Sequence, residues 1–147
     1  MIRQRTVFLD SSALAKQYIA EQGSHYVAQY FIAPATSVHI FVSTLTYVEV
    51  IAAISRRVPA LPVTVLEDFV ADYQQGMQKI ALDRTIIEHA ALLARLRRLR
   101  AADAIQLASV LRIARRTPGV LLVTADLEMI AAAQAEGLQV ENPNRHQ

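Results

Sequence analysis

The sequence has no cysteine, only four glycines and no long apolar segment. Without cysteine the chain forms neither a disulfide nor a thiolate metal site, and an enzyme with a cysteine nucleophile is excluded. The apolar stretch after residues 1–6 is interrupted by Asp10 and Lys16, which makes it too short for a signal peptide. No run approaches the roughly 18 apolar residues of a membrane span. We therefore expect a cytoplasmic protein without a membrane segment.

The chain is apolar enough for a well-packed core, because 53% of its 147 residues are hydrophobic. A chain of this length buries roughly two thirds of the surface that its unfolded form exposes. Disordered chains combine low hydrophobicity with high net charge, whereas the formal charge here is only +2. The sequence contains no internal repeat and no Gly/Ser linker. One domain covering residues 1–147 is the expectation.

Strand and helix patterns alternate along the chain. Strands are predicted at residues 6–9, 38–43, 78–82, 120–124 and 138–140. Helices are predicted at about 11–21, 24–32, 45–57, 64–76, 85–100, 103–116 and 127–136, several of them at Thr-x-x-Glu capping boxes. Strands separated by helices form parallel sheets. The predicted fold is α/β, with a central parallel β-sheet of about four to five short strands flanked by helices in an α/β/α sandwich.

Four acids follow strands or lie near helix starts: Asp10, Glu49, Asp103 and Asp126. Each has a simple structural explanation. Asp10 and Asp126 occupy N-cap positions, and Asp103 can cap the helix that it opens. Glu49 completes a capping box with Thr46. Against this, Glu49 and Asp103 share helical faces with apolar residues, so their carboxylates would point inward and need partners. For each acid alone, both explanations stay open.

Taken together, these four residues, called here the junction acids, indicate a metal site. The ends of parallel strands and the helix starts that follow them gather at one edge of a sheet. Carboxylates that meet there repel one another and have raised pKa values unless a divalent cation neutralises them. Oxygen ligands without cysteine or a histidine cluster favour Mg²⁺ or Mn²⁺ over zinc. Such ions serve phosphoryl transfer and phosphodiester hydrolysis.

The segments that contain the junction acids follow one another in a recognisable order. They are FLDSSALAKQYIAEQGS, VSTLTYVEVIAAISRR, LRAADAIQLASVLRIARR and VLLVTADLEMIAAAQAEGLQVENP. In this order they resemble the motifs of PIN-domain ribonucleases, in particular the VapC-type toxins of bacterial toxin–antitoxin pairs. The resemblance covers nearly the whole chain.

This resemblance implies a single PIN-like domain and an endoribonuclease that depends on Mg²⁺ or Mn²⁺. It implies that the junction acids coordinate the metal and carry the catalysis, with Ser11 and Thr124 as supporting polar groups. It also implies an RNA substrate, a VapB-type antitoxin partner and a homodimer. One position departs from the pattern, because Gln106 stands where many members have a histidine, three residues after Asp103. We interpret it as a change in substrate contact or in local hydrogen bonding.

Arginines concentrate in and after the predicted helix 85–100, and this segment could contact a phosphate backbone. If the junction acids form an internal site, 9 of the 13 acidic residues remain against 15 basic ones, and this remainder of +6 attracts a polyanion. Solvated helix faces explain the same arginines equally well. We favour Arg97 and Arg100 as nucleic-acid contacts because they are closest in sequence to Asp103.

Two other functions stay open. In the first, the protein is a non-catalytic RNA- or protein-binding PIN-like module, and the acids only cap helices. In the second, it is a nuclease that acts on DNA. No residue distinguishes the two sugars, so the prediction of RNA depends on the resemblance.

Overall fold

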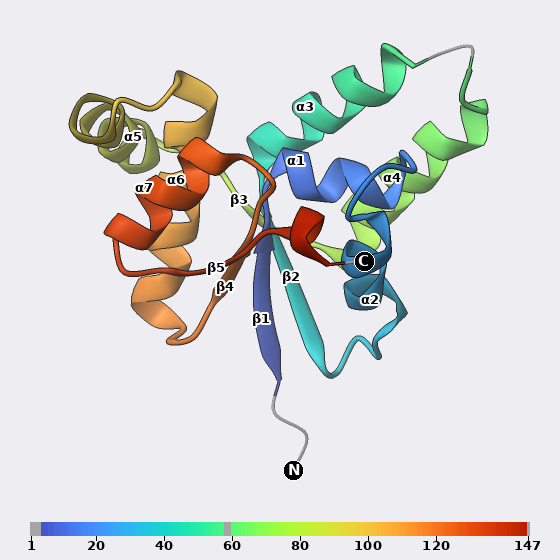
Figure 1. Cartoon of the computed structure of the whole chain (residues 1–147), viewed down its shortest axis with the longest axis horizontal. Coiled ribbons are helices and arrows are strands. Elements are labelled where there is room, and N and C mark those ends of the chain that lie inside the picture. The colour runs from blue at the N-terminus through green and yellow to red at the C-terminus, as the bar shows by residue number, and fades with distance from the viewer. Residues whose placement is uncertain (1–3, 58–59, 147) are drawn as a thin grey trace.

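The computed structural model describes residues 4–57 and 60–146, and in these ranges five parallel strands form one sheet (Figure 1). The strands are β1 (Arg5–Leu9), β2 (Val38–Ser43), β3 (Gln78–Ile80), β4 (Leu121–Val123) and β5 (Gln139–Glu141). Their order across the sheet is β3-β2-β1-β4-β5, and every neighbouring pair is parallel. The predicted α/β fold with a central parallel sheet is confirmed.

Helices cover both faces of this sheet (Figure 1). One face carries α1 (Ser11–Leu14), the 3₁₀ helix η1 (Ala15–Gln17), α2 (Ser24–Ile32), α3 (Thr44–Ser55) and α4 (Val63–Gly76). The other carries α5 (Arg84–Arg97), α6 (Ala101–Arg116) and α7 (Leu127–Ala135), and a short 3₁₀ helix, η2 (Pro143–Arg145), follows β5. Among residues 4–57 and 60–146, no helix is long and apolar enough to cross a membrane.

The central strand β1 contributes to two separate hydrophobic cores. Phe8 packs in the core beneath α5, α6 and α7, whereas Val7 and Leu9 pack in the core beneath α1 to α4. All three side chains are fully buried. Successive side chains of a strand point to opposite faces, and a strand covered on both faces is apolar throughout. The apolar run before Asp10 is therefore the sequence of a central parallel strand.

The register of the sheet brings the ends of β1 and β4 together. Leu9 is paired with Val123, so Asp10 and Thr124 both stand one residue beyond the ends of adjacent strands. The backbone N–H of Asp10 still donates to the carbonyl of Val123, at 3.3 Å. This pairing fixes where the two polar side chains emerge at the carboxyl edge of the sheet.

The predicted capping boxes are wrong. They were predicted at Thr46–Glu49, Thr64–Glu67 and Thr85–Glu88. The N-caps are instead Ser43 for α3, Pro62 for α4 and Asp83 for α5. The hydroxyl of Ser43 accepts from the N–H of Leu45, and the carboxylate of Asp83 accepts from the N–H of Ile86. Each helix begins before its threonine, so the Thr-x-x-Glu spacing falls inside the helix rather than at its start.

The first predicted helix is also shorter than expected, because α1 and η1 end at Gln17 rather than near residue 21. The chain then turns through Gly23, which has a φ of +87°. A Cβ at Gly23 would lie 2.8 Å from Oδ1 of Asn144 and 2.9 Å from the carbonyl carbon of Pro143. The close approach of η2 and a left-handed backbone both require glycine here.

Candidate active site

Asp10 is the most enclosed of the junction acids, with 3% of its surface exposed. Its Oδ1 accepts from the hydroxyl of Ser12 at 2.7 Å and from the N–H of Ala13 at 3.0 Å, and its Oδ2 accepts a short hydrogen bond from the hydroxyl of Thr124. Burial raises the pKa of Asp10 from 3.8 to about 6. The three hydrogen bonds oppose this rise, and the charge of Asp103 adds to it.

The N-cap of α1 is Asp10 itself, as the simpler explanation of this acid predicted. Ser12 lies within α1, and its hydroxyl donates to Asp10 and accepts from the backbone N–H of Ala125, at 3.1 Å. Capping and site formation are therefore carried out by one carboxylate. The contact of Ser12 with Asp10 was not predicted, because Ser11 was the serine expected to support this acid.

Asp103 lies half-buried in the first turn of α6, and the N-cap of that helix is Arg100. The pKa of Asp103 is raised from 3.8 to about 6, first by burial and then by the charges of Asp126 and Glu49. Glu128 adds a smaller rise, and Arg100 lowers the pKa. The fold thus brings residues from α3, α6 and the start of α7 within electrostatic range of one another. Glu128 is a further acid at this edge, and no sequence pattern pointed to it.

Asp126 follows β4 and caps α7, as the simpler explanation predicted. Its Oδ1 accepts from the N–H of Glu128 at 2.9 Å and from the N–H of Met129 at 3.1 Å. Its own N–H donates to the hydroxyl of Thr124 at 3.1 Å. Because Asp126 also raises the pKa of Asp103, the cap lies beside the other acids rather than apart from them.

Glu49 lies in the middle of α3 and is half-buried. Its Oε1 accepts from Nε2 of Gln106 on α6, at 3.0 Å, and the same nitrogen donates to Oγ1 of Thr46 at 2.7 Å. The inward-facing alternative is therefore the correct one for Glu49, and its capping-box partner Thr46 is a fully buried neighbour in the helix.

The junction acids suit a hard divalent cation in their chemistry. All four offer carboxylate oxygens, and two of them have pKa values raised by burial and by neighbouring acids, a repulsion that a cation would relieve. Across residues 4–57 and 60–146, however, no three His, Cys, Asp or Glu side chains form a ready-made metal cage. The fit to a cation therefore rests on the chemistry of the carboxylates and not on a preformed cage.

A groove opens beside the acids, between α1–η1 and α3. We call it the α1–α3 groove, and it has a volume of about 540 Å³. Its lining includes Ser12, Lys16 and Glu49, together with Arg56 and Arg57 at the end of α3. Seven residues of helix separate Glu49 from Arg56, which places the two about 10 Å apart along α3. Both arginines are exposed, and neither was among the arginines favoured from the sequence.

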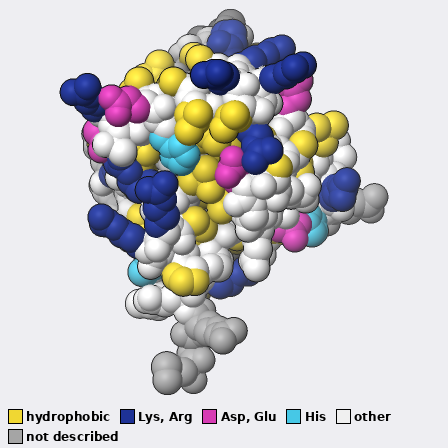
Figure 2. All heavy atoms as spheres, turned by 90° about the vertical axis from the view of Figure 1, so that its left-hand side faces the viewer, with side chains coloured by type: hydrophobic (Ala, Val, Ile, Leu, Met, Phe, Trp, Pro, Cys, Tyr) yellow, Lys and Arg dark blue, Asp and Glu magenta, His cyan; other side chains and the backbone are white. Residues whose placement is uncertain are grey.

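The arginines favoured from the sequence lie on the face of the sheet covered by α5 to α7, opposite the α1–α3 groove. Arg97 and Arg100 are exposed, and Nε of Arg97 pairs with Glu136 at 3.2 Å. Arg112 forms two hydrogen bonds to Asp83, at 2.7 and 2.8 Å. Figure 2 shows basic side chains around apolar ones on this side of the molecule. Arg100 alone of these residues acts on a junction acid, because it lowers the pKa of Asp103.

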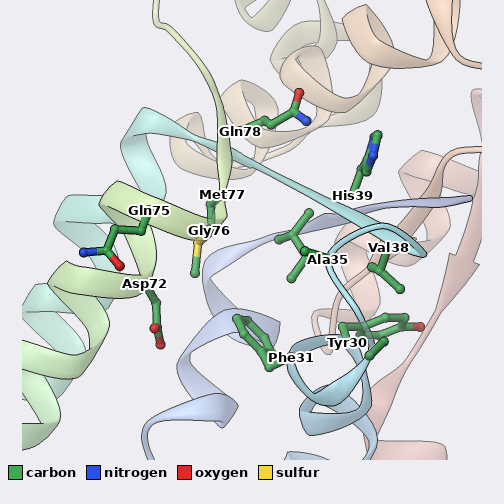
Figure 3. A pocket seen from close by; sticks show the side chains of 12 residues that line it. Tyr30, Phe31, Ala35, Val38, His39, Asp72, Gln75, Gly76, Met77 and Gln78 are labelled. Carbon is green, nitrogen blue, oxygen red and sulfur yellow. The ribbon is translucent and has the colours of Figure 1, made fainter.

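A second pocket of about 460 Å³ lies between α2, α4 and the starts of β2 and β3 (Figure 3). Asp72 is the acid among its described lining residues, and this carboxylate accepts from the hydroxyl of Tyr18 at 2.7 Å. The hydrogen bond from Tyr18 gives Asp72 a structural role in this pocket. The described lining of the pocket includes none of the junction acids, so the candidate site is the α1–α3 groove and the edge beside it.

Residues 7–140 match the PIN domain, and the chain belongs to this family. Ribonucleases VapC45 (strain CDC 1551 / Oshkosh) and VapC49 (strain ATCC 25618 / H37Rv) of Mycobacterium tuberculosis are each 31% identical to it over 139 residues, covering 91% of this chain and 93% of the relative. A toxin–antitoxin complex from Klebsiella pneumoniae contains a similar chain, with a TM-score of 0.64 and 18% identity over 93% of this chain and 97% of the other. The family and the nuclease class that the four motifs predicted are confirmed.

Proposed function

We propose that this protein is an endoribonuclease that hydrolyses RNA phosphodiester bonds with Mg²⁺ or Mn²⁺ held by the junction acids. The observation that carries the proposal is that hydrogen bonds join acids of separate elements at one edge of the sheet: Thr124 contacts both Asp10 and Asp126, and Gln106 on the helix of Asp103 contacts Glu49. The charges of Asp126 and Glu49 add to burial in raising the pKa of Asp103. Isolated helix caps would have no reason to be gathered in this way. The likeness to ribonucleases VapC45 and VapC49 supports RNA as the substrate.

Asp10, Glu49, Asp103 and Asp126 are the residues that would hold the ion. Once bound, a divalent cation supplies activation of water and stabilisation of the leaving oxygen. Asp10 is held in a fixed orientation by Ser12, Ala13 and Thr124, so its carboxylate needs little reordering when the substrate arrives. Ser11 also lines the groove and remains a proposed supporting group.

The α1–α3 groove is the proposed path of the RNA strand. Arg56 and Arg57 line it and offer charge to backbone phosphates, while Ser12 and Glu49 line it beside the acids. Arg97 and Arg100 remain proposed contacts on the other side of the acids. A strand that enters along α3 would meet Arg56 and Arg57 before it meets Glu49. The other carboxylate of the lining, Glu21, is paired with Lys16 at 3.1 Å.

The proposed partner is a VapB-type antitoxin, and the toxin is proposed to act in the cytoplasm as a homodimer. The similar chain from Klebsiella pneumoniae is part of a toxin–antitoxin complex, which supports such a partner. Co-expression with the product of an adjacent small gene, followed by co-purification, tests the pairing. Growth arrest on induction of the protein alone, relieved by the partner, is the expected result.

RNA cleavage tests the mechanism directly. Wild type, Asp10→Asn and Asp103→Asn are incubated with total RNA in Mg²⁺ or in EDTA, with Glu88→Gln as the matched control. Glu88 is an exposed acid on α5 that pairs with Arg84. Cleavage by wild type and the control, but not by the two site variants or in EDTA, is expected. Cleavage that persists in EDTA or in Asp103→Asn would refute the metal-acid mechanism, and cleavage of DNA instead of RNA would refute the substrate.

A further inference from the structure

Gln106 is a polar residue in an otherwise apolar part of α6, and 2% of its surface is exposed. It lies three residues after Asp103, so the two side chains share one face of the helix. Its amide nitrogen donates both to Thr46 at 2.7 Å and to Glu49 at 3.0 Å. Gln106 therefore connects the helix that carries Asp103 to the helix that carries Glu49.

The orientation of this amide follows from its partner. A carboxylate only accepts hydrogen bonds, so the nitrogen of the Gln106 amide, not its oxygen, must face Glu49. Both N–H groups of Nε2 are then in use. Among the described residues, nothing donates to the buried Oε1 of Gln106. A buried oxygen without a donor disfavours folding, so an apolar side chain would serve the core better at this position.

We propose that Gln106 is a positioning residue for Glu49, retained because it orients this carboxylate toward the other junction acids. The inference rests on the proposed function. Without Gln106 the Glu49 side chain, which is half-buried, would rotate among its staggered rotamers. Residues that hydrogen-bond to metal-binding carboxylates fix ligand orientation in this way, and their loss typically weakens metal binding or activity about 10- to 100-fold.

The test compares Gln106→Met, which is similar in size but has no donor, with Gln106→His, which keeps an N–H. Calorimetric titration with Mn²⁺ in the absence of RNA gives the metal affinity, and thermal melting gives the stability. Gln106→Met is expected to weaken Mn²⁺ binding about 10- to 100-fold and to lower kcat for RNA cleavage with little change in KM. Gln106→His is expected to recover most of the affinity. Gln106→Asn, which is too short to reach Glu49 from the same backbone position, replaces Gln106→Met if the latter does not fold.

Thr46→Val distinguishes a role of Gln106 in orienting Glu49 from a role in only holding α6 against α3. It removes one acceptor of Gln106 but leaves the hydrogen bond to Glu49, so it should weaken Mn²⁺ binding less than Gln106→Met does. Equal Mn²⁺ affinity in Gln106→Met and wild type overturns the proposal. The proposal is also overturned if Gln106→Met and Thr46→Val both lose Mn²⁺ affinity in proportion to the decrease in their melting temperatures.

Asp103→Asn shows whether a negative result concerns only the positioning role of Gln106 or the proposed function as a whole. If Asp103→Asn weakens Mn²⁺ binding while Gln106→Met does not, the positioning role is wrong and the proposed function stands. If Asp103→Asn also binds Mn²⁺ as wild type does, the proposed function itself is wrong.

Discussion

Asp10→Asn is expected to make the metal-free protein more stable at neutral pH. Asparagine caps helices about as well as aspartate, so the substitution keeps the cap of α1. It removes the charge, and it also replaces the oxygen that accepts from Thr124 by an NH2 group. Burial raises the pKa of Asp10 from 3.8 to about 6. One pKa unit corresponds to about 1.4 kcal/mol, so the ionised carboxylate costs about 3 kcal/mol of unfolding free energy.

The size of this effect depends on pH. Because the folded protein has the higher pKa, the stability associated with Asp10 is fully present below pH 3.8 and is lost as the pH rises through about 6. The stability of Asp10→Asn relative to wild type should therefore increase by up to about 3 kcal/mol between pH 4 and pH 7. Saturating Mn²⁺ should stabilise wild type and reduce the difference.

Urea unfolding in EDTA at both pH values measures the difference. Asp83→Asn is the matched control, because Asp83 is also an N-cap but its hydrogen bond from Arg112 lowers its pKa to about 2. That variant should be less stable than wild type at neutral pH. If the stability of Asp10→Asn relative to wild type does not increase between pH 4 and pH 7 in EDTA, the electrostatic cost assigned to Asp10 is wrong.

Three further changes have defined outcomes. Gly23→Ala should lower the free energy of unfolding by about 1 to 3 kcal/mol in denaturant titrations, because its Cβ would clash with η2, and an unchanged midpoint would contradict the close packing. Arg100→Gln should move the acidic limb of the pH–rate profile to higher pH, because Arg100 lowers the pKa of Asp103; a limb that stays in place excludes this coupling. Arg56→Ala combined with Arg57→Ala should weaken RNA binding and flatten its salt dependence in filter-binding assays, and an unaltered salt slope would remove the groove from the RNA path.

Much of the fold was predictable because its pattern is local. The run 6–9 and the segment 120–124 are continuous apolar stretches, which is what parallel strands buried on both faces require. Asp10 directly follows the first run and Asp126 lies two residues after the second, and the carboxyl edge of a parallel sheet is a known location for sites. The order of elements and the candidate acids could therefore be inferred from one sequence.

The contacts of the site could not be inferred, because they join residues far apart in the chain. Ser12, rather than Ser11, turns toward Asp10 because its hydroxyl also accepts from Ala125, 113 residues later. Gln106 meets Glu49 across 57 residues. The turn at Gly23 packs against η2, near the other end of the described chain. Local patterns contain no information about such partners.

The two hydrophobic cores described above have a consequence for how activity arises during folding. Asp10 and Glu49 belong to the layer of α1 to α4, whereas Asp103 and Asp126 belong to the layer of α5 to α7. Hydrogen bonds from Thr124 to Asp10 and from Gln106 to Glu49 join the layers. A chain in which only one layer has formed holds at most two of the four acids. Under the proposed function, cleavage therefore requires that both layers have formed and have docked on the sheet.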